Sequence, residues 1–393
     1  MSKYVKLIFI SENNNNKYYE MIYEGGNNFT INYGRIESTK TTLSKPYKKW
    51  DSIYNEKIKK GYKDVTHLVS EIKEDKKTQS SIDDIIVGKD VVLDFLYLMK
   101  KYTDGLVSKT YTVKAKDVTL SQITTAQRII DELLGLSSKD DKLINSKLIE
   151  LYMIIPRYMG KVQNYLLPNI DLNKTLQQEQ DNIDALSYQI NTIKVSETPD
   201  AVEKNKPLSL LDLLGVEMTE AKEYSEIKYL IDQIPSKKIK NIFTVNKKDH
   251  NDIFNDWLIK QNNKDTKFLL HGTRCTSVIP IIEQGLKIRP SGNFQFSGKV
   301  YGEGSYFSEV VSKSLNYTGY DPDKILLVYE VHVGNPFIYD GWYRGNSFPL
   351  NYEELKKRGS DSTYVKAGNG LLNSEIIAYK ETQYSLKYII WLN

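Results

Sequence analysis

The stretch Phe268-Leu-Leu-His-Gly-Thr-Arg274 decides how the C-terminal half of the chain is interpreted. It reads as an apolar strand that ends in a polar turn beginning at His271. Such a turn is a usual place for a binding site, because rigid structure holds exposed polar groups there. The stretch is weak by itself, since His271 could also be a strand-end histidine that hydrogen-bonds to backbone.

Two later stretches carry compatible chemistry. Tyr301-Gly-Glu-Gly-Ser-Tyr-Phe-Ser308 and Ser312-Lys-Ser-Leu-Asn-Tyr317 combine glycines, hydroxyls and tyrosines. Two aromatic rings can enclose a flat ring such as nicotinamide, and a Ser hydroxyl with a backbone amide can hold its carboxamide. Tyrosine packing around a tight turn is the alternative.

Asn373-Ser-Glu-Ile-Ile-Ala-Tyr379 places Glu375 at the start of an apolar strand. A charge there needs a partner such as a ribose diol, unless the strand start lies at the surface.

In this order, the three stretches resemble the catalytic domain of poly(ADP-ribose) polymerases, whose signature is a His-Tyr-Glu triad. The resemblance extends over Gln284-Gly-Leu-Lys287, Val311-Ser-Lys-Ser-Leu-Asn-Tyr317 and Ser374-Glu-Ile-Ile-Ala-Tyr-Lys380. It implies an NAD+-dependent ADP-ribosyltransferase domain over residues 207–393, with a mixed, mainly antiparallel β structure.

The resemblance assigns a role to each matched residue. His271 would bond a ribose hydroxyl of NAD+, and Tyr306 would lie on the nicotinamide ring. Glu375 would bond the 2′-hydroxyl of the nicotinamide ribose, stabilise the oxocarbenium-like transition state and polarise the incoming ribose hydroxyl during elongation. The implied catalytic residues are Glu375, His271 and Tyr306. Because Glu375 is retained, we expect polymer formation, with a mono-ADP-ribosyltransferase as the alternative.

The remaining cofactor contacts also follow from the resemblance. The Gly272 backbone and the Ser314 hydroxyl would fix the carboxamide, and Tyr317 would cover the second face of the nicotinamide. Lys287 stands where the family often has Arg, so a single contact replaces a bidentate one. Thr273 and Lys287 would lie toward the adenosine, and Lys313 near the acceptor. The implied NAD+-binding residues are His271, Gly272, Thr273, Lys287, Tyr306, Lys313, Ser314 and Tyr317.

Residues 78–195 are predicted to form an all-α helical bundle. The clearest helical period runs from Thr119 to Leu134, with Thr119 or Ser121 available as a cap. Similar patterns cover residues 83–102, 146–155 and 179–193. The segments 120–130, 151–157 and 182–190 resemble the family's regulatory domain, which packs on the NAD+ cleft and loosens on activation. A passive spacer is the alternative.

Residues 1–70 are predicted to form a small antiparallel β domain with a helix. Strand patterns cover 5–9, 19–23 and 29–35, and a helical pattern covers 45–60 before Gly61. Ile31-Asn-Tyr-Gly-Arg-Ile-Glu37 resembles the Trp-Gly-Arg motif of a nucleic-acid-binding domain, with Tyr33 in place of Trp. Nearby lysines could contact phosphates or form a solvated face. The nucleic-acid candidates are Tyr33, Arg35, Lys40, Lys45, Lys48 and Lys49.

Composition narrows the remaining choices. The single cysteine, Cys275, excludes a disulfide within the chain and a cysteine-based zinc site, and we expect no metal. No stretch approaches about 18 apolar residues, so we expect an intracellular protein without a membrane partner. It would lie in the nucleus of a eukaryote or in the cytoplasm or nucleoid of a bacterium. Polar segments at 71–82 and 196–206 are predicted linkers.

Together these features predict a multidomain α+β protein. The expected function is a poly(ADP-ribose) polymerase activated by damaged or nicked DNA, with NAD+ as substrate and proteins as acceptors. A catalytically silent DNA-binding scaffold is the alternative from another functional class.

Overall fold

The computed structural model describes residues 2–36, 38–68, 90–136, 140–196, 209–288, 301–339, 351–368 and 371–393. Backbone proximity divides the chain into two units, residues 1–80 with 105–190 and residues 81–104 with 191–393. Glu37 and both predicted linkers, apart from Ser196, lie outside the described residues. The division into domains at 1–70, 78–195 and 207–393 stays a prediction.

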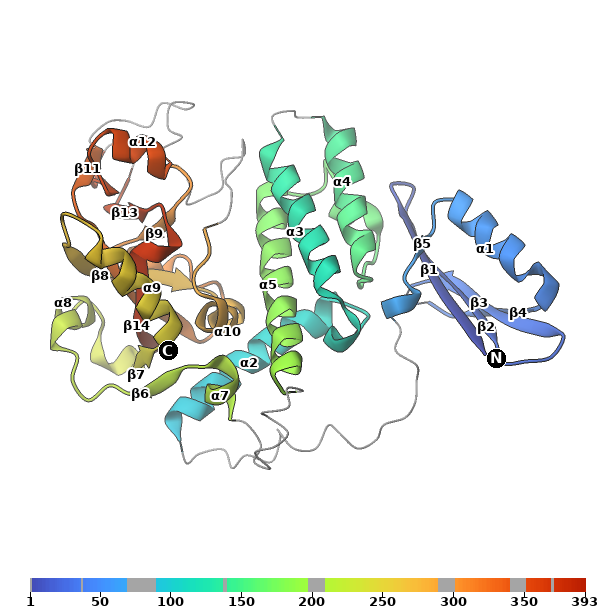
Figure 1. Ribbon diagram of the computed structural model, residues 1–393, viewed down its shortest axis with the longest axis horizontal. Coiled ribbons are helices and arrows are strands. Elements are labelled where there is room, and N and C mark those ends of the chain that lie inside the picture. Colours follow the sequence, from blue (N-terminus) through green and yellow to red (C-terminus); the bar gives the residue numbers. More distant parts are fainter. Residues whose placement is uncertain are drawn as a thin grey trace. The chain divides into compact units, whose positions relative to one another are not determined.

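The N-terminal part is an antiparallel sheet with strand order β4-β3-β2-β1-β5. Alternating apolar residues of three strands form its core with the ring of Trp50 from the helix, as the period-2 pattern predicts. Figure 1 shows the helix α1 beside this sheet. The elements are β1 (Lys3–Ser11), β2 (Asn15–Tyr23), β3 (Asn28–Arg35), β4 (Thr41–Pro46), α1 (Trp50–Lys59) and β5 (Lys63–Asp64).

The predicted helix at 45–60 begins later than expected. Residues up to Pro46 belong to β4, which pairs with β3, and a short 3-10 turn at Tyr47–Lys49 leads into α1. Proline has no N–H to donate and disfavours a helical conformation in the residue before it, so the helix starts only beyond Pro46.

Three helices of the first unit run side by side in Figure 1. The predicted cap is confirmed at Thr119, whose hydroxyl accepts from Gln122 N at 3.3 Å while the Gln122 side chain accepts from Thr119 N at 3.0 Å. A buried ion pair between Arg157 and Glu179, 2.7 Å apart, lies inside this bundle. The helices are α3 (Leu120–Gly135), α4 (Asp141–Ile154) and α5 (Leu172–Ser196).

Helix α2 (Val91–Thr110) contributes residues to both units. In its first part, the ring of Phe95 lies 4.9 Å from that of Phe243 and 5.4 Å from that of Trp391. Thr103 donates to the Thr276 carbonyl at 2.9 Å. The beginning of α2 is therefore packed on the C-terminal sheet, although the sequence groups it with the other helices.

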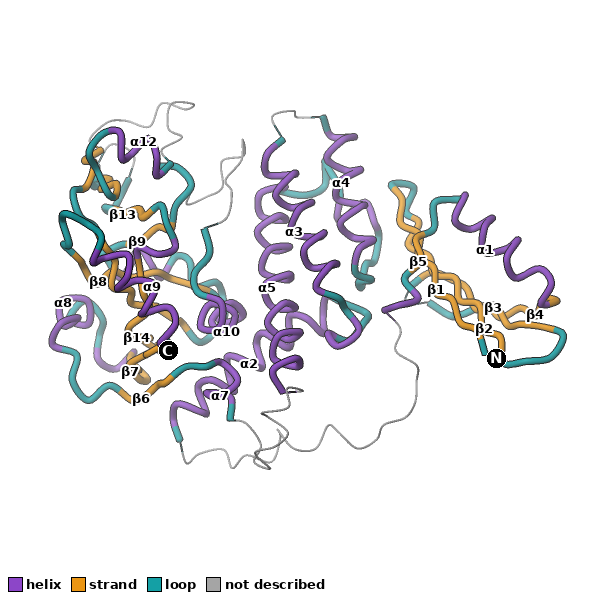
Figure 2. The backbone as a smooth tube through the Cα atoms, in the orientation of Figure 1, coloured by secondary structure: helices purple, strands orange, loops and turns teal. Residues whose placement is uncertain are grey.

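The C-terminal part contains two sheets. The larger is antiparallel with order β6-β7-β14-β10-β8, and the smaller has order β11-β12-β13-β9 with β11 and β12 parallel. Figure 2 shows these strands alternating with short helices and loops. The strands are β6 (Glu217–Glu220), β7 (Ile239–Asn246), β8 (Thr266–Thr273), β9 (Ser305–Phe307), β10 (Lys324–His332), β11 (Pro336–Tyr339), β12 (Ser362–Val365), β13 (Glu375–Ala378) and β14 (Tyr384–Leu392). The helices are α7 (Leu210–Leu214), α8 (Lys228–Ile231), α9 (Lys248–Ile259), α10 (Cys275–Gln284), α11 (Val311–Leu315) and α12 (Tyr352–Lys357).

The expectation of a mixed α+β fold is confirmed, and the strands expected at Phe268 and from Glu375 onward are present as β8 and β13. One local prediction is wrong. His271 does not begin a turn, because β8 continues through Gly272 to Thr273 and pairs with β10 along this whole length. A strand is recognised in the sequence by its apolar residues alone, so the polar residues from His271 onward are predicted to form a turn. The backbone pairing of β8 with β10 does not require apolar side chains and continues through these residues.

Candidate active site

Three strands bring the predicted His-Tyr-Glu residues into one region of the second unit. His271 lies in β8, Tyr306 in β9, and Glu375 is the first residue of β13. Strand β9 pairs with β13, and the residue after it, Ser308, bonds to Leu270 of β8 through reciprocal backbone hydrogen bonds of 2.9 and 3.0 Å. The short strand β9 therefore links the strands that carry the other two residues.

The imidazole of His271 is held in one orientation. Its Nδ1 atom lies 3.0 Å from the Tyr306 carbonyl oxygen. A carbonyl oxygen only accepts, so Nδ1 carries the hydrogen and Nε2 is left as an acceptor. Burial lowers the pKa of His271, and the hydrogen bond to Tyr306 offsets part of this effect. The imidazole is therefore neutral, and its Nε2 atom can accept a hydrogen bond from a hydroxyl group.

Glu375 is almost fully buried and paired. It is 5% exposed, and its Oε1 atom lies 2.7 Å from Lys313 Nζ on α11. Burial acts to lower the pKa of Lys313, but the hydrogen bond and charge of Glu375 outweigh it, so this pKa is raised. Burial is the main cause that raises the pKa of Tyr306, and the Glu375 charge adds to it. The carboxylate therefore lies within electrostatic reach of the phenol.

Gly272 and Ser314 are in direct contact. A Cβ atom at residue 272 would overlap the backbone carbonyl oxygen of Ser314. The Ser314 hydroxyl is buried and donates to the Leu270 carbonyl at 3.5 Å, the long limit of a hydrogen bond. Only glycine permits this approach of β8 and α11. The two residues predicted to hold the carboxamide are thus brought together.

The other predicted cofactor residues differ in their burial and in their partners. Tyr317 is 41% exposed, and Lys313 Nζ lies 5.7 Å from the centroid of its ring. Thr273 is buried at the end of β8. Lys287 forms an exposed ion pair with Glu381 at 3.0 Å. A nucleotide bound there would compete with Glu381 for the single lysine charge.

Sequence reasoning missed the residues that support this centre. The Ser308 hydroxyl donates to the Ser374 carbonyl at 3.1 Å, which ties β9 to the residue before Glu375. Tyr301 and Tyr379 are 2% and 5% exposed and belong to one apolar cluster. Both tyrosines lie inside the stretches that carry the family resemblance, but a tyrosine-rich composition hides which rings are structural.

The nucleic-acid candidates lie in the N-terminal sheet region. The ring of Tyr33 lies 5.9 Å from that of Tyr19. Arg35 donates to the Asn14 carbonyl at 2.8 Å, to Asn14 Oδ1 at 3.0 Å and to the Gly160 carbonyl. Its guanidinium is therefore engaged within the first unit. Lys40, Lys48 and Lys49 are exposed, and Lys45 is half-buried on β4.

The described residues contain neither a candidate metal-binding cluster nor a helix that could span a membrane. No group of three or more His, Cys, Asp or Glu side chains that could hold a metal ion occurs in the part of the chain that the structure describes. Within the same residues, no helix has the length and apolar character needed to cross a membrane.

Known proteins resemble this chain in sequence. Some matches cover less than half of the chain, and one covers nearly all of it. The family model of the poly(ADP-ribose) polymerase catalytic domain matches residues 221–393. The poly(ADP-ribose) polymerase-like protein 100L of Invertebrate iridescent virus 6 is 60% identical over 171 residues, 43% of this chain and 94% of that protein. The uncharacterized protein 101L of the same virus is 44% identical over 193 residues, 48% of this chain and 79% of that protein. Poly(ADP-ribose) polymerase 2-B of rice is 25% identical over 443 residues, 97% of this chain and 70% of that protein.

The matched domain and the site define the class of protein as an NAD+ ADP-ribosyltransferase. The His271, Tyr306 and Glu375 side chains all lie within the matched residues. The chain belongs to the poly(ADP-ribose) polymerase family.

Proposed function

We propose that this protein is a DNA-break-activated poly(ADP-ribose) polymerase. It transfers ADP-ribose from NAD+ to protein acceptors, extends the chain and releases nicotinamide. The observation that carries the proposal is the buried Glu375 carboxylate, paired with Lys313 at 2.7 Å beside the His271–Tyr306 contact.

The proposed chemistry assigns one task to each polar group. Nε2 of His271 accepts a hydrogen bond from a ribose hydroxyl and so orients the nicotinamide ribose. Lys313 occupies Oε1 of Glu375, so Oε2 accepts the 2′-hydroxyl and stabilises positive charge at the ribose C1′ atom. The C1′–N bond breaks, nicotinamide leaves with the electron pair, and an acceptor oxygen attacks C1′. The acceptor proton passes to the Glu375 carboxylate or to solvent.

Polymer formation requires that the acceptor be a ribose hydroxyl of a previous unit. A buried carboxylate can polarise that hydroxyl, which supports elongation over single-unit transfer. The test is a gel that resolves product length after incubation with labelled NAD+. Ladders of long products are expected from the wild type, and single units alone would establish the mono-ADP-ribosyltransferase alternative. Absence of any NAD+ consumption would favour the catalytically silent scaffold.

Activation by broken DNA is supported by the resemblance of Tyr33-Gly-Arg35 on β3 to the Trp-Gly-Arg motif, with the Arg35 guanidinium bonded within the first unit and Tyr33 left for stacking. The exposed Lys48 and Lys49 would contact phosphates. We expect binding to nicked DNA to weaken with salt, and Lys48→Ala with Lys49→Ala to lower the log–log salt slope by about 0.9 for each phosphate that is no longer neutralised. Lys237→Ala with Lys238→Ala, two exposed lysines of the second unit, is the charge-matched control. An unchanged slope in the double variant would remove these lysines from the interface.

The helical region is proposed to restrain the catalytic site, with the passive spacer as the alternative. Deletion of residues 78–195 is expected to raise basal activity, but it also removes Phe95, which packs against Phe243 and Trp391. A deletion of residues 111–190 keeps α2 (Val91–Thr110) and is therefore the sharper test. Raised NAD+ consumption without DNA supports restraint. Equal or lower activity in a folded protein supports the spacer.

The proposal also assigns a location. A DNA-dependent enzyme that consumes NAD+ would act inside the cell, in the nucleus of a eukaryote or in the cytoplasm or nucleoid of a bacterium. Fluorescence microscopy of the tagged protein in its native cell tests this, and exclusion from DNA would contradict it.

A further inference from the structure

Tyr379 follows directly after β13 and has its hydroxyl buried between two partners. The hydroxyl oxygen lies 2.8 Å from the Tyr301 carbonyl oxygen and 2.8 Å from Thr363 Oγ1. A carbonyl only accepts, so the single phenol hydrogen goes to Tyr301 and the Thr363 hydroxyl donates to Tyr379. The donor and the acceptor of each hydrogen bond at this hydroxyl are therefore assigned.

The residue that receives this hydrogen bond also holds Tyr306. The Tyr301 backbone N–H donates to the Tyr306 hydroxyl at 2.8 Å, and that hydroxyl donates to the Gly302 carbonyl at 3.0 Å. The Tyr306 hydroxyl is thus bonded on both sides by the turn at residues 301–302. The phenol position depends on this turn, and the ring face is the part left for a ligand.

Close packing fixes the other end of the same turn. A Cβ atom at Gly304 would lie 2.5 Å from Ile377 Cγ2 and 2.6 Å from the Ala378 carbonyl oxygen. The turn therefore lies against β13 in the two residues before Tyr379, and it contacts this segment through both backbone packing and the Tyr379 hydroxyl.

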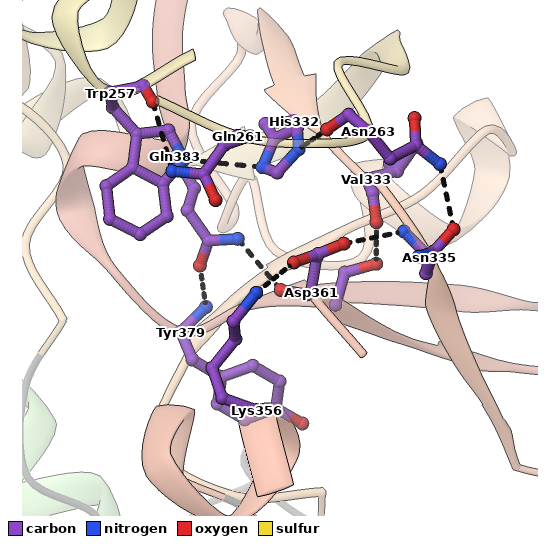
Figure 3. A network of polar contacts seen from close by, with 11 residues as sticks. Trp257, Gln261, Asn263, His332, Val333, Asn335, Lys356, Asp361, Tyr379 and Gln383 are labelled. Carbon is purple, nitrogen blue, oxygen red and sulfur yellow. Dashed lines mark hydrogen bonds and ion pairs between the residues drawn. The ribbon is translucent and has the colours of Figure 1, made fainter. Parts of the chain in front are cut away.

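The backbone of Tyr379 belongs to a polar network that also contains Gln383 and Asp361 (Figure 3). Gln383 Oε1 accepts from the backbone N–H groups of Tyr379 at 2.8 Å and Lys380 at 2.9 Å. Gln383 Nε2 donates to the Asp361 carbonyl at 2.9 Å, and the Asp361 carboxylate pairs with Lys356 at 2.6 Å. The backbone of Tyr379 is consequently held by Gln383 in addition to its contacts with the turn.

We propose that Tyr379 is a positioning residue for the nicotinamide-binding face of the site. It acts through the Tyr301 carbonyl and the 301–304 turn on the ring of Tyr306. This inference rests on the proposed function and on the expectation, from the family resemblance, that Tyr306 lies on the nicotinamide ring. It adds a residue that never contacts the substrate but determines how one part of the substrate is bound.

Binding of two separate fragments of the substrate tests the proposal on the full chain. Tyr379→Phe keeps the ring but removes the donor to the Tyr301 carbonyl, so a buried acceptor is left unsatisfied. We expect calorimetric binding of nicotinamide to weaken about tenfold. Binding of ADP-ribose, which lacks the nicotinamide ring, is expected to change less than twofold.

Two further variants make the comparison specific. Thr363→Val removes the donor to Tyr379 but keeps the hydrogen bond to Tyr301, so a smaller loss of nicotinamide affinity is expected. Tyr329→Phe is the matched control, because Tyr329 is 2% exposed and its hydroxyl has no hydrogen-bond partner in the described parts of the chain. Its affinities for both fragments should equal those of the wild type.

The outcomes separate cleanly. Selective loss of nicotinamide affinity supports the proposal. Unchanged nicotinamide affinity, or equal loss for both fragments, overturns it, the latter by showing a general structural effect. Fragment binding needs no turnover, so a wild type that binds nicotinamide yet consumes no NAD+ would refute the proposed function without touching the role of Tyr379.

Discussion

Lys313 Nζ lies 2.7 Å from Glu375 Oε1, and their side chains are 18% and 6% exposed. The two residues are far apart in sequence, and α11 presents the lysine to the first residue of β13. A carboxylate buried to this degree needs a counter-charge, because desolvation of an unpaired ion is costly. Lys313 supplies that counter-charge through Oε1, and Oε2 of Glu375 is left for the ribose hydroxyl in the proposed mechanism.

Glu375→Gln is expected to lower kcat for NAD+ consumption by about 100-fold or more, because the amide keeps the shape but loses the stabilising charge. The measurement is nicotinamide release at saturating NAD+. Glu330→Gln is the control, since Glu330 is a strand glutamate on β10 that accepts from Thr266 at 3.2 Å. Wild-type kcat in the Glu375 variant would remove this residue from the mechanism.

Gly272→Ala is expected to destabilise the second unit by about 1–3 kcal/mol or more, because the added Cβ atom overlaps the Ser314 carbonyl. Denaturant unfolding followed by Trp fluorescence measures this loss. Gly105→Ala is the control, because an added Cβ atom there meets nothing within 4 Å and alanine favours the helix by up to about 1 kcal/mol. Equal stability of the two variants would contradict the close approach of β8 and α11.

The stability of the protein should depend on pH through His271. Its folded-state pKa is lowered by burial, so as pH falls below about 6.5 the unfolded state takes up the proton first. Stability is therefore full above this pH and is lost as pH falls toward the folded-state pKa. Denaturant unfolding between pH 7.5 and 5 should show a steeper loss for the wild type than for His271→Gln.

The same pH series contains its own reference. Burial also lowers the pKa of His250, and this contribution is common to the wild type and the His271 variant. The difference between the two curves therefore isolates His271. Parallel curves would show that His271 becomes charged as easily in the folded protein as in the unfolded one.

The buried pair Arg157–Glu179 is expected to control the stability of the helical bundle. Glu179→Ala leaves the Arg157 guanidinium buried without its carboxylate, which costs about 3–5 kcal/mol. Thermal unfolding should move to a lower temperature. If the bundle restrains the enzyme, NAD+ consumption without DNA should rise at the same time.

Glu132→Ala provides the comparison on the same bundle. Glu132 pairs with Lys147 at 2.5 Å but is 36% exposed, so its loss should cost at most about 1 kcal/mol. Equal destabilisation by the two variants would show that burial of the Arg157–Glu179 pair has no special weight. Lower stability without a rise in basal activity would support the spacer interpretation.

The N-terminal strands and the α3 helix could be predicted because their signals are local. Alternating apolar residues identify a half-buried strand, and Thr119 with Gln122 forms a cap within one helical turn. The limits of α1 and the length of β8 were predicted less well. In both cases the backbone pairing of β4 with β3 and of β8 with β10 extends beyond the apolar pattern.

The candidate site shows the same division. The amino-acid types and order of His271, Tyr306 and Glu375 are properties of the sequence, and the family resemblance that they carry was sufficient to predict the class of enzyme. Three other features of the site could not be predicted from the sequence. They are the contact of Lys313 with Glu375, the approach of Gly272 to Ser314 and the hydrogen bonds of Tyr379. They join segments distant along the chain, so their partners are chosen by packing and by the need to satisfy buried polar groups. The sequence by itself determined which reactive groups are present, and only the tertiary structure decided which groups hold them.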